Sequence, residues 1–209
     1  MTRLLYTPEQ EQQLKKESKS SGGAYTPYMS TLEFDTPYRI ALVAPEDINV
    51  PTSIVFYEVW GVKPDGKKSP QRFMTEPTPS EIEEKFNELV LIRPDNRYGE
   101  GPDPVRKGIA YSIWNYQTSQ IEVMSTTTYG VWNGITEISA LEDYRSKMFD
   151  IDLSIVKSSN SGKTSYKVNA VPRRDGATDI IVAAWDLTQK EGVFDLRRLY
   201  TGGSPFSES

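Results

Sequence analysis

Residues 107–172 carry a run of short periodic segments that leaves few folds open. In KGIAYSIWNY the apolar or aromatic residues Ile109, Tyr111 and Ile113 occupy every second position. After a turn at 117–119, QIEVMST repeats this alternation. Alternation with a period of two is typical of strands that bury one face. This part of the chain therefore predicts a β-hairpin.

A helix and a second hairpin follow in the sequence. The segment after the first hairpin predicts a helix because its apolar residues form one stripe at helical spacing, namely Val131, Ile135, Ile138 and Leu141. FDIDLSIVKS and TSYKVNAV then alternate again, separated by turn-forming residues at 158–162. They predict two further antiparallel strands.

The resulting order is strand, strand, helix, strand, strand. With one more strand in front, this is the order of the five-stranded OB-fold barrel, whose helix lies between the third and fourth strands. PYRIALVAP and SIVFYEVWGV supply that first strand and an extra strand. The sequence therefore predicts a mainly β fold, a five-stranded OB-fold barrel with added helices.

Two helices are expected outside this pattern. Thr78-Pro79-Ser80-Glu81 combines a hydroxyl cap, a proline and an acid in the first turn, which predicts the start of an inserted helix. DIIVAAWDLTQ predicts a C-terminal helix. The expected apolar faces are Ile82, Phe86, Leu89 and Val90 on the inserted helix and Ile180, Ala183, Ala184 and Leu187 on the C-terminal helix.

We expect the chain to have three parts. These are a flexible N-terminal arm at 1–30, an OB-fold domain at 31–190 with an insertion at about 64–106, and a C-terminal segment and tail at 191–209. The first ten residues lack the apolar core of a signal peptide, and no apolar run is long enough to cross a bilayer. The sequence thus favours a cytoplasmic protein that does not contact a membrane.

Composition excludes several kinds of chemistry. The chain has no Cys and no His, so disulfides, Cys-based zinc sites and a serine–histidine triad are excluded. No phosphate-binding loop or dinucleotide fingerprint is present, and we expect no cofactor and no enzymatic activity. The alternative is a carboxylate metal site, because Asp150 and Asp152 share one strand face and Asp95, Asp103 or Glu122 could add oxygen ligands.

Several segments resemble OB-fold single-stranded-DNA-binding proteins encoded by bacteriophages. The resemblance spans roughly residues 37–174, and it rests on IWNY at 113–116, IEVM at 121–124, FDIDL at 149–153, KTSYKV at 163–168 and Pro172. It implies a protein that coats and protects single-stranded DNA during phage-type replication or recombination, in the host cytoplasm. The implied partners are single-stranded DNA, further copies of the chain along the strand, and replication or recombination proteins.

Binding of single strands without sequence preference requires aromatic faces on which bases stack, worth about 1–3 kcal/mol per base, and cations along the phosphates. Strand alternation would place Trp114 and Tyr116 on one outward face and Phe56 and Trp60 on another. The predicted nucleic-acid-binding residues are Phe56, Trp60, Lys67, Lys68, Arg72, Trp114, Tyr116, Lys167, Arg173 and Arg174.

Each of these residues has a structural alternative. The aromatic side chains could pack beneath the inserted or C-terminal helix, and the cations could belong to an ordinary solvated surface. The whole barrel could also be a protein-interaction or virion/host-interaction module without nucleic-acid binding. The net charge is −5, so nucleic-acid binding requires acids and cations to lie on separate surfaces. Acids do gather in the inserted helix, at Glu81, Glu83, Glu84 and Glu88.

Overall fold

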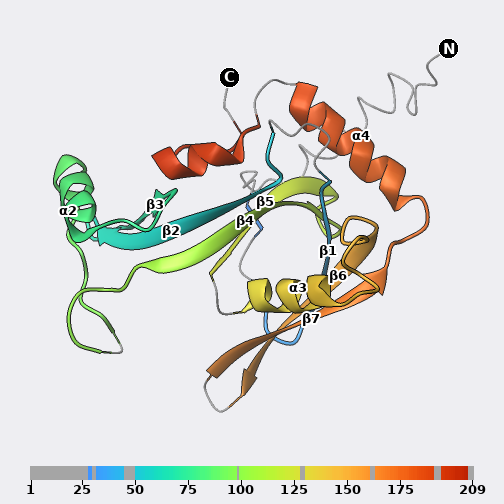
Figure 1. The fold of residues 1–209 in the computed structure, drawn as a ribbon, viewed down its shortest axis with the longest axis horizontal. Helices are drawn as coiled ribbons and strands as arrows, with labels where there is room; N and C mark the ends of the chain where they lie inside the picture. Colours follow the sequence, from blue (N-terminus) through green and yellow to red (C-terminus); the bar gives the residue numbers. More distant parts are fainter. Residues whose placement is uncertain are drawn as a thin grey trace.

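The computed structural model describes residues 28–29, 32–44, 50–97, 99–127, 130–160, 163–190 and 194–206 (Figure 1). The strands are β1 (Pro37–Leu42), β2 (Ser53–Val62), β3 (Lys68–Phe73), β4 (Arg106–Asn115), β5 (Gln120–Thr127), β6 (Ile151–Asn160) and β7 (Lys163–Pro172). The helices are α2 (Pro79–Glu88), α3 (Val131–Ala140), α4 (Ala177–Lys190) and the 3-10 helix η1 (Leu196–Thr201). The prediction of a mainly β chain with added helices is confirmed. None of the described helices has the length and apolar character needed to span a membrane.

The predicted N-terminal arm lies outside the described residues, apart from a few positions at its C-terminal end. Tyr28 forms an isolated bridge with Val123 of β5, and the Met29 N–H donates to the Val123 carbonyl at 3.0 Å. The chain therefore enters the described structure beside β5.

β4 is the strand on which the sheet is built. Its first half pairs with β2 and its last residues pair with β1 on the same edge, while β5 pairs along the other edge. All pairs of strands in the sheet are antiparallel, in the order β3-β2-β4-β1-β6-β7 with β5 added to β4. β4 thus joins the two halves of the sheet.

Both predicted hairpins form. β4 pairs with β5 from Gly108↔Thr127 to Asn115↔Gln120, and β6 pairs with β7 along their whole length. β1 connects the hairpins by pairing with β4 and β6. Within the described residues, however, β5 and β7 do not pair with each other, and α3 contacts both strands instead. The sheet is therefore open, and closure into the predicted five-stranded barrel is not seen.

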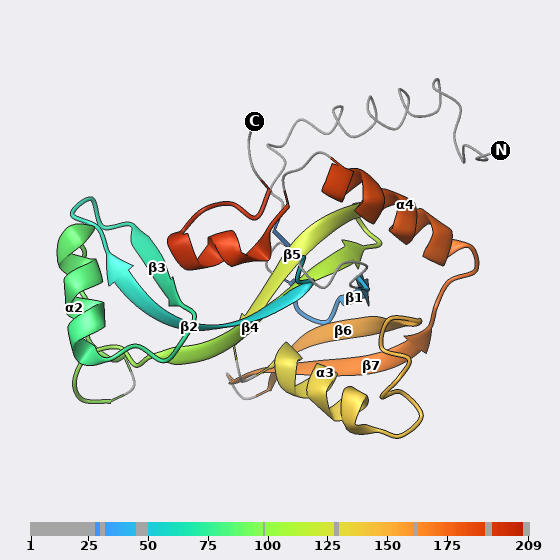
Figure 2. The ribbon, with the colours of Figure 1, turned by 45° about the horizontal axis from the view of Figure 1, so that its top comes forward.

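Helices cover both faces of this sheet, with α3 on one side and α4 and η1 on the other (Figure 2). Because both faces are covered, two successive residues of one strand can both be buried. The core on the α3 side includes Ile40, Ile113, Val131, Ile135, Ile138 and Leu153. The core on the α4 side includes Ala41, Phe56, Trp114, Val123, Trp185 and Leu196.

A glycine lets α3 approach β7 closely. A Cβ added to Gly134 would lie 2.5 Å from Cγ2 of Val168, which is closer than real side chains approach. The predicted apolar stripe of α3 is buried except for its last member, because the helix ends at Ala140 and Leu141 is 54% exposed. The contact with β7 therefore depends on the small residue in the middle of α3.

The C-terminal helix forms as predicted, but its buried face is different. Ala177, Ile181 and Trp185, at spacings of four residues, pack into the core. Ile180 and Leu187, which we expected to be buried, are 44% and 49% exposed. α4 carries two apolar stripes, and helical spacing alone does not distinguish the one that faces the sheet.

The N-terminal end of α2 forms the predicted cap. Oγ1 of Thr78 accepts a hydrogen bond from the Glu81 N–H at 3.3 Å, and Oε2 of Glu81 accepts from the Thr78 N–H at 2.7 Å. These reciprocal bonds form a capping box. Ile82 and Phe86 are buried as predicted, against Val59 of β2.

The C-terminal end of α2 differs from the prediction. The Val90 N–H donates to the Asn87 carbonyl at 3.3 Å and the Leu91 N–H to the Phe86 carbonyl at 2.8 Å, the paired bonds of a Schellman motif. This turn directs Leu91 into the core, so Leu89 and Val90 are 46% and 66% exposed. Val90 has φ of 52°, at the position where glycine is usual and where a β-branched residue is strained.

Candidate nucleic-acid interface

Asp152 lies at the centre of a charged cluster where β1, β6 and β7 meet. Its side chain is completely buried. Nε of Arg39 lies 2.6 Å from Oδ2 of Asp152, and Nε of Arg173 lies 2.8 Å from Oδ1. The Tyr116 hydroxyl donates to the same Oδ1 at 2.9 Å. A buried carboxylate requires such partners, because an unpaired charge is strongly unfavourable away from water.

The two paired arginines also hold neighbouring strands together. Nη2 of Arg39 donates to the carbonyl of Pro172 at the end of β7. Nη2 of Arg173 donates to the carbonyls of Phe149 and Ile151, at 2.8 Å each. These bonds fix the end of β7 relative to β1 and the start of β6. We call Arg39, Tyr116, Asp152, Arg173 and Arg174 the arginine–tyrosine cluster.

The Tyr116 ring is the aromatic element of this cluster. Cζ of Arg174 lies 4.8 Å from the ring centroid and Cζ of Arg39 lies 5.4 Å from it. The Trp114 ring supports the Tyr116 ring edge-on, with 6.4 Å between centroids. Burial, followed by the hydrogen bond and the charge of Asp152, raises the pKa of Tyr116 to about 12. The ring is therefore neutral near pH 7, held in one orientation and flanked by cations.

Arg174 differs from the other two arginines because it is exposed. Within the described part of the chain its guanidinium has no hydrogen bond and no ion pair, only the contact with the Tyr116 ring. Three guanidinium groups and one carboxylate give the cluster a local excess of two positive charges, in a chain of net charge −5. The cluster is thus locally positive although the whole chain is negative, and binding to an anionic polymer requires such a positive surface.

Lys167 and Asn169 extend this surface along β7. The strand register pairs Asn169 with Ser154 and Ser154 with Arg39, so these three side chains share one face of the sheet. Lys167 lies two residues before Asn169 on the same face and is exposed, whereas Val168 packs on the α3 side. The alternation predicted for this strand is confirmed. The candidate interface is the arginine–tyrosine cluster together with this face of β6 and β7.

Phe56 and Trp114 do not contribute an exposed stacking surface, and their predicted exposure is wrong. They are 1% and 6% exposed, in the core between the sheet and the C-terminal helices. The Phe56 ring lies so close to β4 that a Cβ added to Gly108 would be 2.5 Å from Cζ of the ring. Strand alternation correctly predicted that Ile113 and Trp114 lie on opposite faces of β4. The face that carries Trp114 is buried as well, because the C-terminal helices cover it. Both residues therefore follow the alternative prediction, in which the aromatic side chains pack beneath a helix.

Arg173 and Arg72 are also committed to internal contacts. The Arg173 side chain is only 10% exposed because it holds Asp152. Nε of Arg72 lies 3.1 Å from Oε2 of Glu58, and its Cζ lies 4.9 Å from the Phe56 ring centroid. The Arg72 and Glu58 side chains are 18% and 7% exposed. We had expected both arginines at the surface, and the structure uses them to balance buried carboxylates.

Trp60, Lys67 and Lys68 lie on the hairpin of β2 and β3, in another part of the molecule. Trp60 is half-buried opposite Pro70, and both lysines are exposed, with Nζ of Lys67 3.3 Å from Oδ2 of Asp65. We call residues 57–92, which include the outer half of β2, β3 and α2, the lobe. It projects at the opposite end from β6 and β7 (Figures 1 and 2). The structure therefore separates the predicted residues into three groups. Tyr116, Lys167, Arg173 and Arg174 belong to the candidate interface, Trp60, Lys67, Lys68 and Arg72 to the lobe, and Phe56 and Trp114 to the core.

The carboxylates of the alternative metal site are used in other ways. Asp152 is paired with two arginines, and Asp150 is exposed just before β6. Oδ1 of Asp103 lies 2.6 Å from Nη2 of Arg106, and Glu122 accepts hydrogen bonds from uncharged side chains. Among the residues that the structure describes, no three acidic side chains gather as a metal site would require.

The roles of Arg39 and Asp152 were not predicted from the sequence. Each is a charged residue among apolar ones in a predicted strand, within PYRIALVAP and within FDIDL respectively. Two opposite charges in two buried strands are a signal for an internal ion pair, since isolated buried charges are rare. The β1–β6 register, which sequence does not give, is what brings the two residues together.

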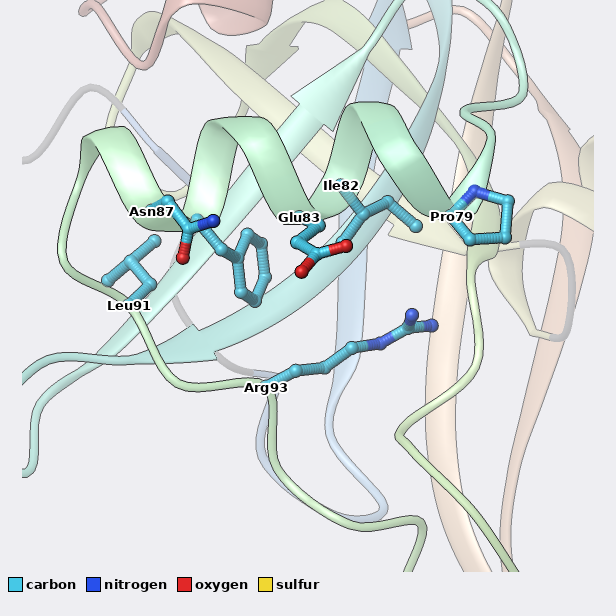
Figure 3. Close-up of a pocket in the computed structure, with 7 residues that line it drawn as sticks. Pro79, Ile82, Glu83, Asn87, Leu91 and Arg93 are labelled. Carbon is cyan, nitrogen blue, oxygen red and sulfur yellow. The ribbon is translucent and has the colours of Figure 1, made fainter.

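A second feature is a pocket of about 270 Å³ beneath α2, in the lobe (Figure 3). Its apolar wall is formed by Ile82, Phe86 and Leu91, and Arg93 extends across its open side. Nε and Nη2 of Arg93 donate to the Asp103 carbonyl at 3.0 and 2.7 Å, so the chain itself already occupies these donors. The pocket does not share residues with the arginine–tyrosine cluster.

Comparison of the sequence with protein-family models gives no match, and neither does comparison with curated proteins.

Proposed function

We propose that this chain binds single-stranded DNA on the face of β1, β6 and β7 that carries the arginine–tyrosine cluster. One observation carries the proposal. A neutral tyrosine ring, oriented by a buried carboxylate, lies 4.8 Å from an exposed arginine that has no other partner in the described chain. Aromatic rings beside cations, on a positively charged surface, are the features that bind single strands without sequence preference.

The cluster assigns a different task to each residue. Asp152, Arg39 and Arg173 form the internal support that orients Tyr116. The Tyr116 ring offers a stacking surface for a base. Arg174 and Lys167 are exposed and supply charge for the phosphates on either side. Contacts of this kind recognise backbone charge and base planes, and they carry no direct sequence information.

The strand order supports an OB-like arrangement for this half of the molecule. β1, the β4–β5 hairpin, α3 and the β6–β7 hairpin follow one another as in an OB-fold, although the sheet is open. Together with the resemblance to phage single-strand-binding proteins, this arrangement favours a non-enzymatic protein that coats and protects single-stranded DNA during replication or recombination. We place that activity in the cytoplasm of a host cell, alongside replication or recombination proteins.

Fluorescence anisotropy tests the proposal directly. A labelled oligo-dT strand, a duplex of equal length and a matched RNA are titrated with the protein at low and moderate salt. We expect the single strand to bind more tightly than the duplex. Arg174→Ala should weaken single-strand binding about tenfold, equivalent to ~1.4 kcal/mol, because a phosphate and a ring lose their cation.

Arg197→Ala is the matched control, because Arg197 is an exposed arginine of η1 that pairs with Asp195. It removes the same charge outside the proposed interface and should leave affinity within about twofold, since most surface cations contribute little. If the single strand does not bind at all, the proposal is wrong and the alternative of a protein-interaction module is the one to test next. If Arg197→Ala and Arg174→Ala weaken binding equally, only net charge matters and the cluster is not the interface.

A further inference from the structure

The end of the lobe exposes apolar side chains that the fold does not require there. Leu89, Val90 and Ile92 are 46%, 66% and 67% exposed, while Leu91 between them is buried. Val62 and Ile92 exchange backbone hydrogen bonds of 2.8 and 2.9 Å, which holds this segment against the end of β2. We call Leu89, Val90 and Ile92 the tip patch.

The conformation of Val90 is a second, independent observation about this patch. Val90 occupies the position of the Schellman motif at which glycine is favoured, with φ of 52°. A strained backbone at a β-branched residue persists where the surroundings impose it, and such sites cluster where proteins contact ligands or partners. The fold would be served better by glycine, so an exposed valine here indicates a contact that the isolated chain does not show.

Opposite charges flank the tip patch. On one side α2 exposes four glutamates and carries one lysine, giving it a net charge of −3. On the other side the β2–β3 turn carries Lys63, Lys67 and Lys68 with only Asp65, giving it a net charge of +2. The Val62↔Ile92 bridge places this basic turn next to the apolar segment. The patch is therefore apolar at its centre, acidic on one flank and basic on the other.

We propose that the tip patch binds the tip patch of a second copy of this chain, in a two-fold symmetric contact. In such an isologous contact the same surface lies on both sides and must complement itself. A two-fold axis through the apolar centre would bring the acidic α2 of each copy against the basic turn of the other. This inference does not depend on nucleic-acid binding by the arginine–tyrosine cluster, which lies at the opposite end of the molecule (Figure 1).

The expected association is weak. Stable dimers commonly bury about 1,600 Å² in total, which a contact confined to the end of one lobe does not reach. We therefore expect a dissociation constant weaker than about 1 µM. Such a contact would matter where copies are concentrated, for example when they are held on one DNA strand.

Sedimentation of the full chain over a range of concentrations gives the first test. We expect the mean mass to rise from that of a monomer and to level off at that of a dimer. Val90→Gly should reduce association at least tenfold while raising Tm by about 2–4 °C, because glycine relieves the strain as it removes the contact. A residue that served only the fold could not produce these opposite changes. Leu187→Ser, which removes an exposed apolar side chain from α4, outside the lobe, is the control and should associate normally.

Charge reversal gives the second test. The variant Lys67→Glu/Lys68→Glu makes both flanks acidic, and Glu84→Lys/Glu88→Lys makes the acidic flank basic. Each variant alone should stay monomeric, and an equimolar mixture should form dimers again, because every flank then meets its opposite. A wild-type chain that stays monomeric at about 1 mM would overturn the proposal. So would growth beyond the dimer, undiminished association of Val90→Gly, or failure of the mixture to associate.

Discussion

Asp152 illustrates how one side chain can determine the arrangement of several others. It is completely buried, and it accepts from Tyr116 while it neutralises Arg39 and Arg173. Removal of the carboxylate would leave two guanidinium groups close together with no counter-charge. The Tyr116 hydroxyl would also lose the hydrogen-bond acceptor that orients its ring. The candidate interface therefore depends on Asp152, which is buried and does not itself contact a ligand.

The first prediction follows from this burial. Asp152→Asn should lower the free energy of unfolding by about 3 kcal/mol, because breaking a buried ion pair leaves an uncompensated charge. Asp150→Asn is the control, since Asp150 is exposed two residues away and should change stability by less than about 0.5 kcal/mol. Denaturant unfolding followed by circular dichroism measures both. Equal effects of the two substitutions would contradict the role assigned to Asp152.

The second prediction concerns alkaline pH. Burial raises the pKa of Tyr116 and of Tyr111 to about 12, whereas a tyrosine ordinarily titrates near 10. A raised pKa means that the folded state holds its proton more tightly than the unfolded state, so this stability is present below about pH 10 and is lost between about 10 and 12. Tyr116→Phe should flatten this decline, and Tyr111→Phe should flatten it separately. An ultraviolet titration in which neither substitution removes a late-titrating tyrosine would contradict the prediction.

At the level of secondary-structure elements, most strands and helices could be predicted because their signals are local. Alternation identified both hairpins, and Thr78 with Glu81 identified the start of α2. β3 was not predicted and lies within the insertion expected at about 64–106, because Lys68–Phe73 contains a proline and few apolar residues. It forms because β2 offers an edge for pairing, which is a tertiary effect.

The faces of these elements were harder to predict than the elements themselves. Trp114 and Ile113 are adjacent, yet both are buried, because α4 and α3 cover opposite sides of β4. In α4 the buried stripe runs through Ile181 and not through Ile180. Periodicity shows that two faces differ, but which face is covered depends on how the elements pack against one another.

The third prediction tests the packing of α3 on β7. Alanine is usually favoured over glycine inside a helix, by about 1 kcal/mol. At Gly134, however, a Cβ would lie 2.5 Å from Cγ2 of Val168, so Gly134→Ala should destabilise the fold by about 1–2 kcal/mol through overpacking. In a Val168→Gly background, Cγ2 and Cβ of Val168, at 2.5 and 2.7 Å, are both absent and the nearest remaining atom is Cα at 3.7 Å, so Gly134→Ala should become stabilising. A double-mutant cycle from thermal unfolding measures this change of sign. Additive effects would mean that α3 does not approach β7 this closely.

For the molecule as a whole, the distribution of charge matters more than the net charge of −5. Cations of the arginine–tyrosine cluster lie at one end, and the glutamates of α2 lie in the lobe at the other (Figure 2). The sequence showed both the cations and the glutamates, and the prediction that Lys167 and Arg174 are exposed agrees with the structure. It could not show that Lys67 and Lys68 belong to a different end, because that depends on the path of the β2–β3 hairpin.

The last prediction separates these two ends by the salt dependence of binding. Each phosphate neutralised on a single strand contributes about −0.7 to the slope of log affinity against log salt. If Lys167 and Arg174 each contact a phosphate, the double substitution Lys167→Ala/Arg174→Ala should reduce the slope by about 1.4 and weaken binding to all sequences alike. Arg173 is left in place because it is paired with Asp152.

The matched control is Lys67→Ala/Lys68→Ala, which removes two exposed cations from the lobe. Both double variants change the net charge from −5 to −7, so any effect of overall charge is the same for the two proteins. A short labelled dT strand at low protein concentration keeps contacts between copies out of the measurement. The slope should therefore fall for Lys167→Ala/Arg174→Ala and stay unchanged for the lobe variant. The reverse result would place the path of the phosphates on the β2–β3 hairpin, and equal changes would mean that the strand responds to net charge alone.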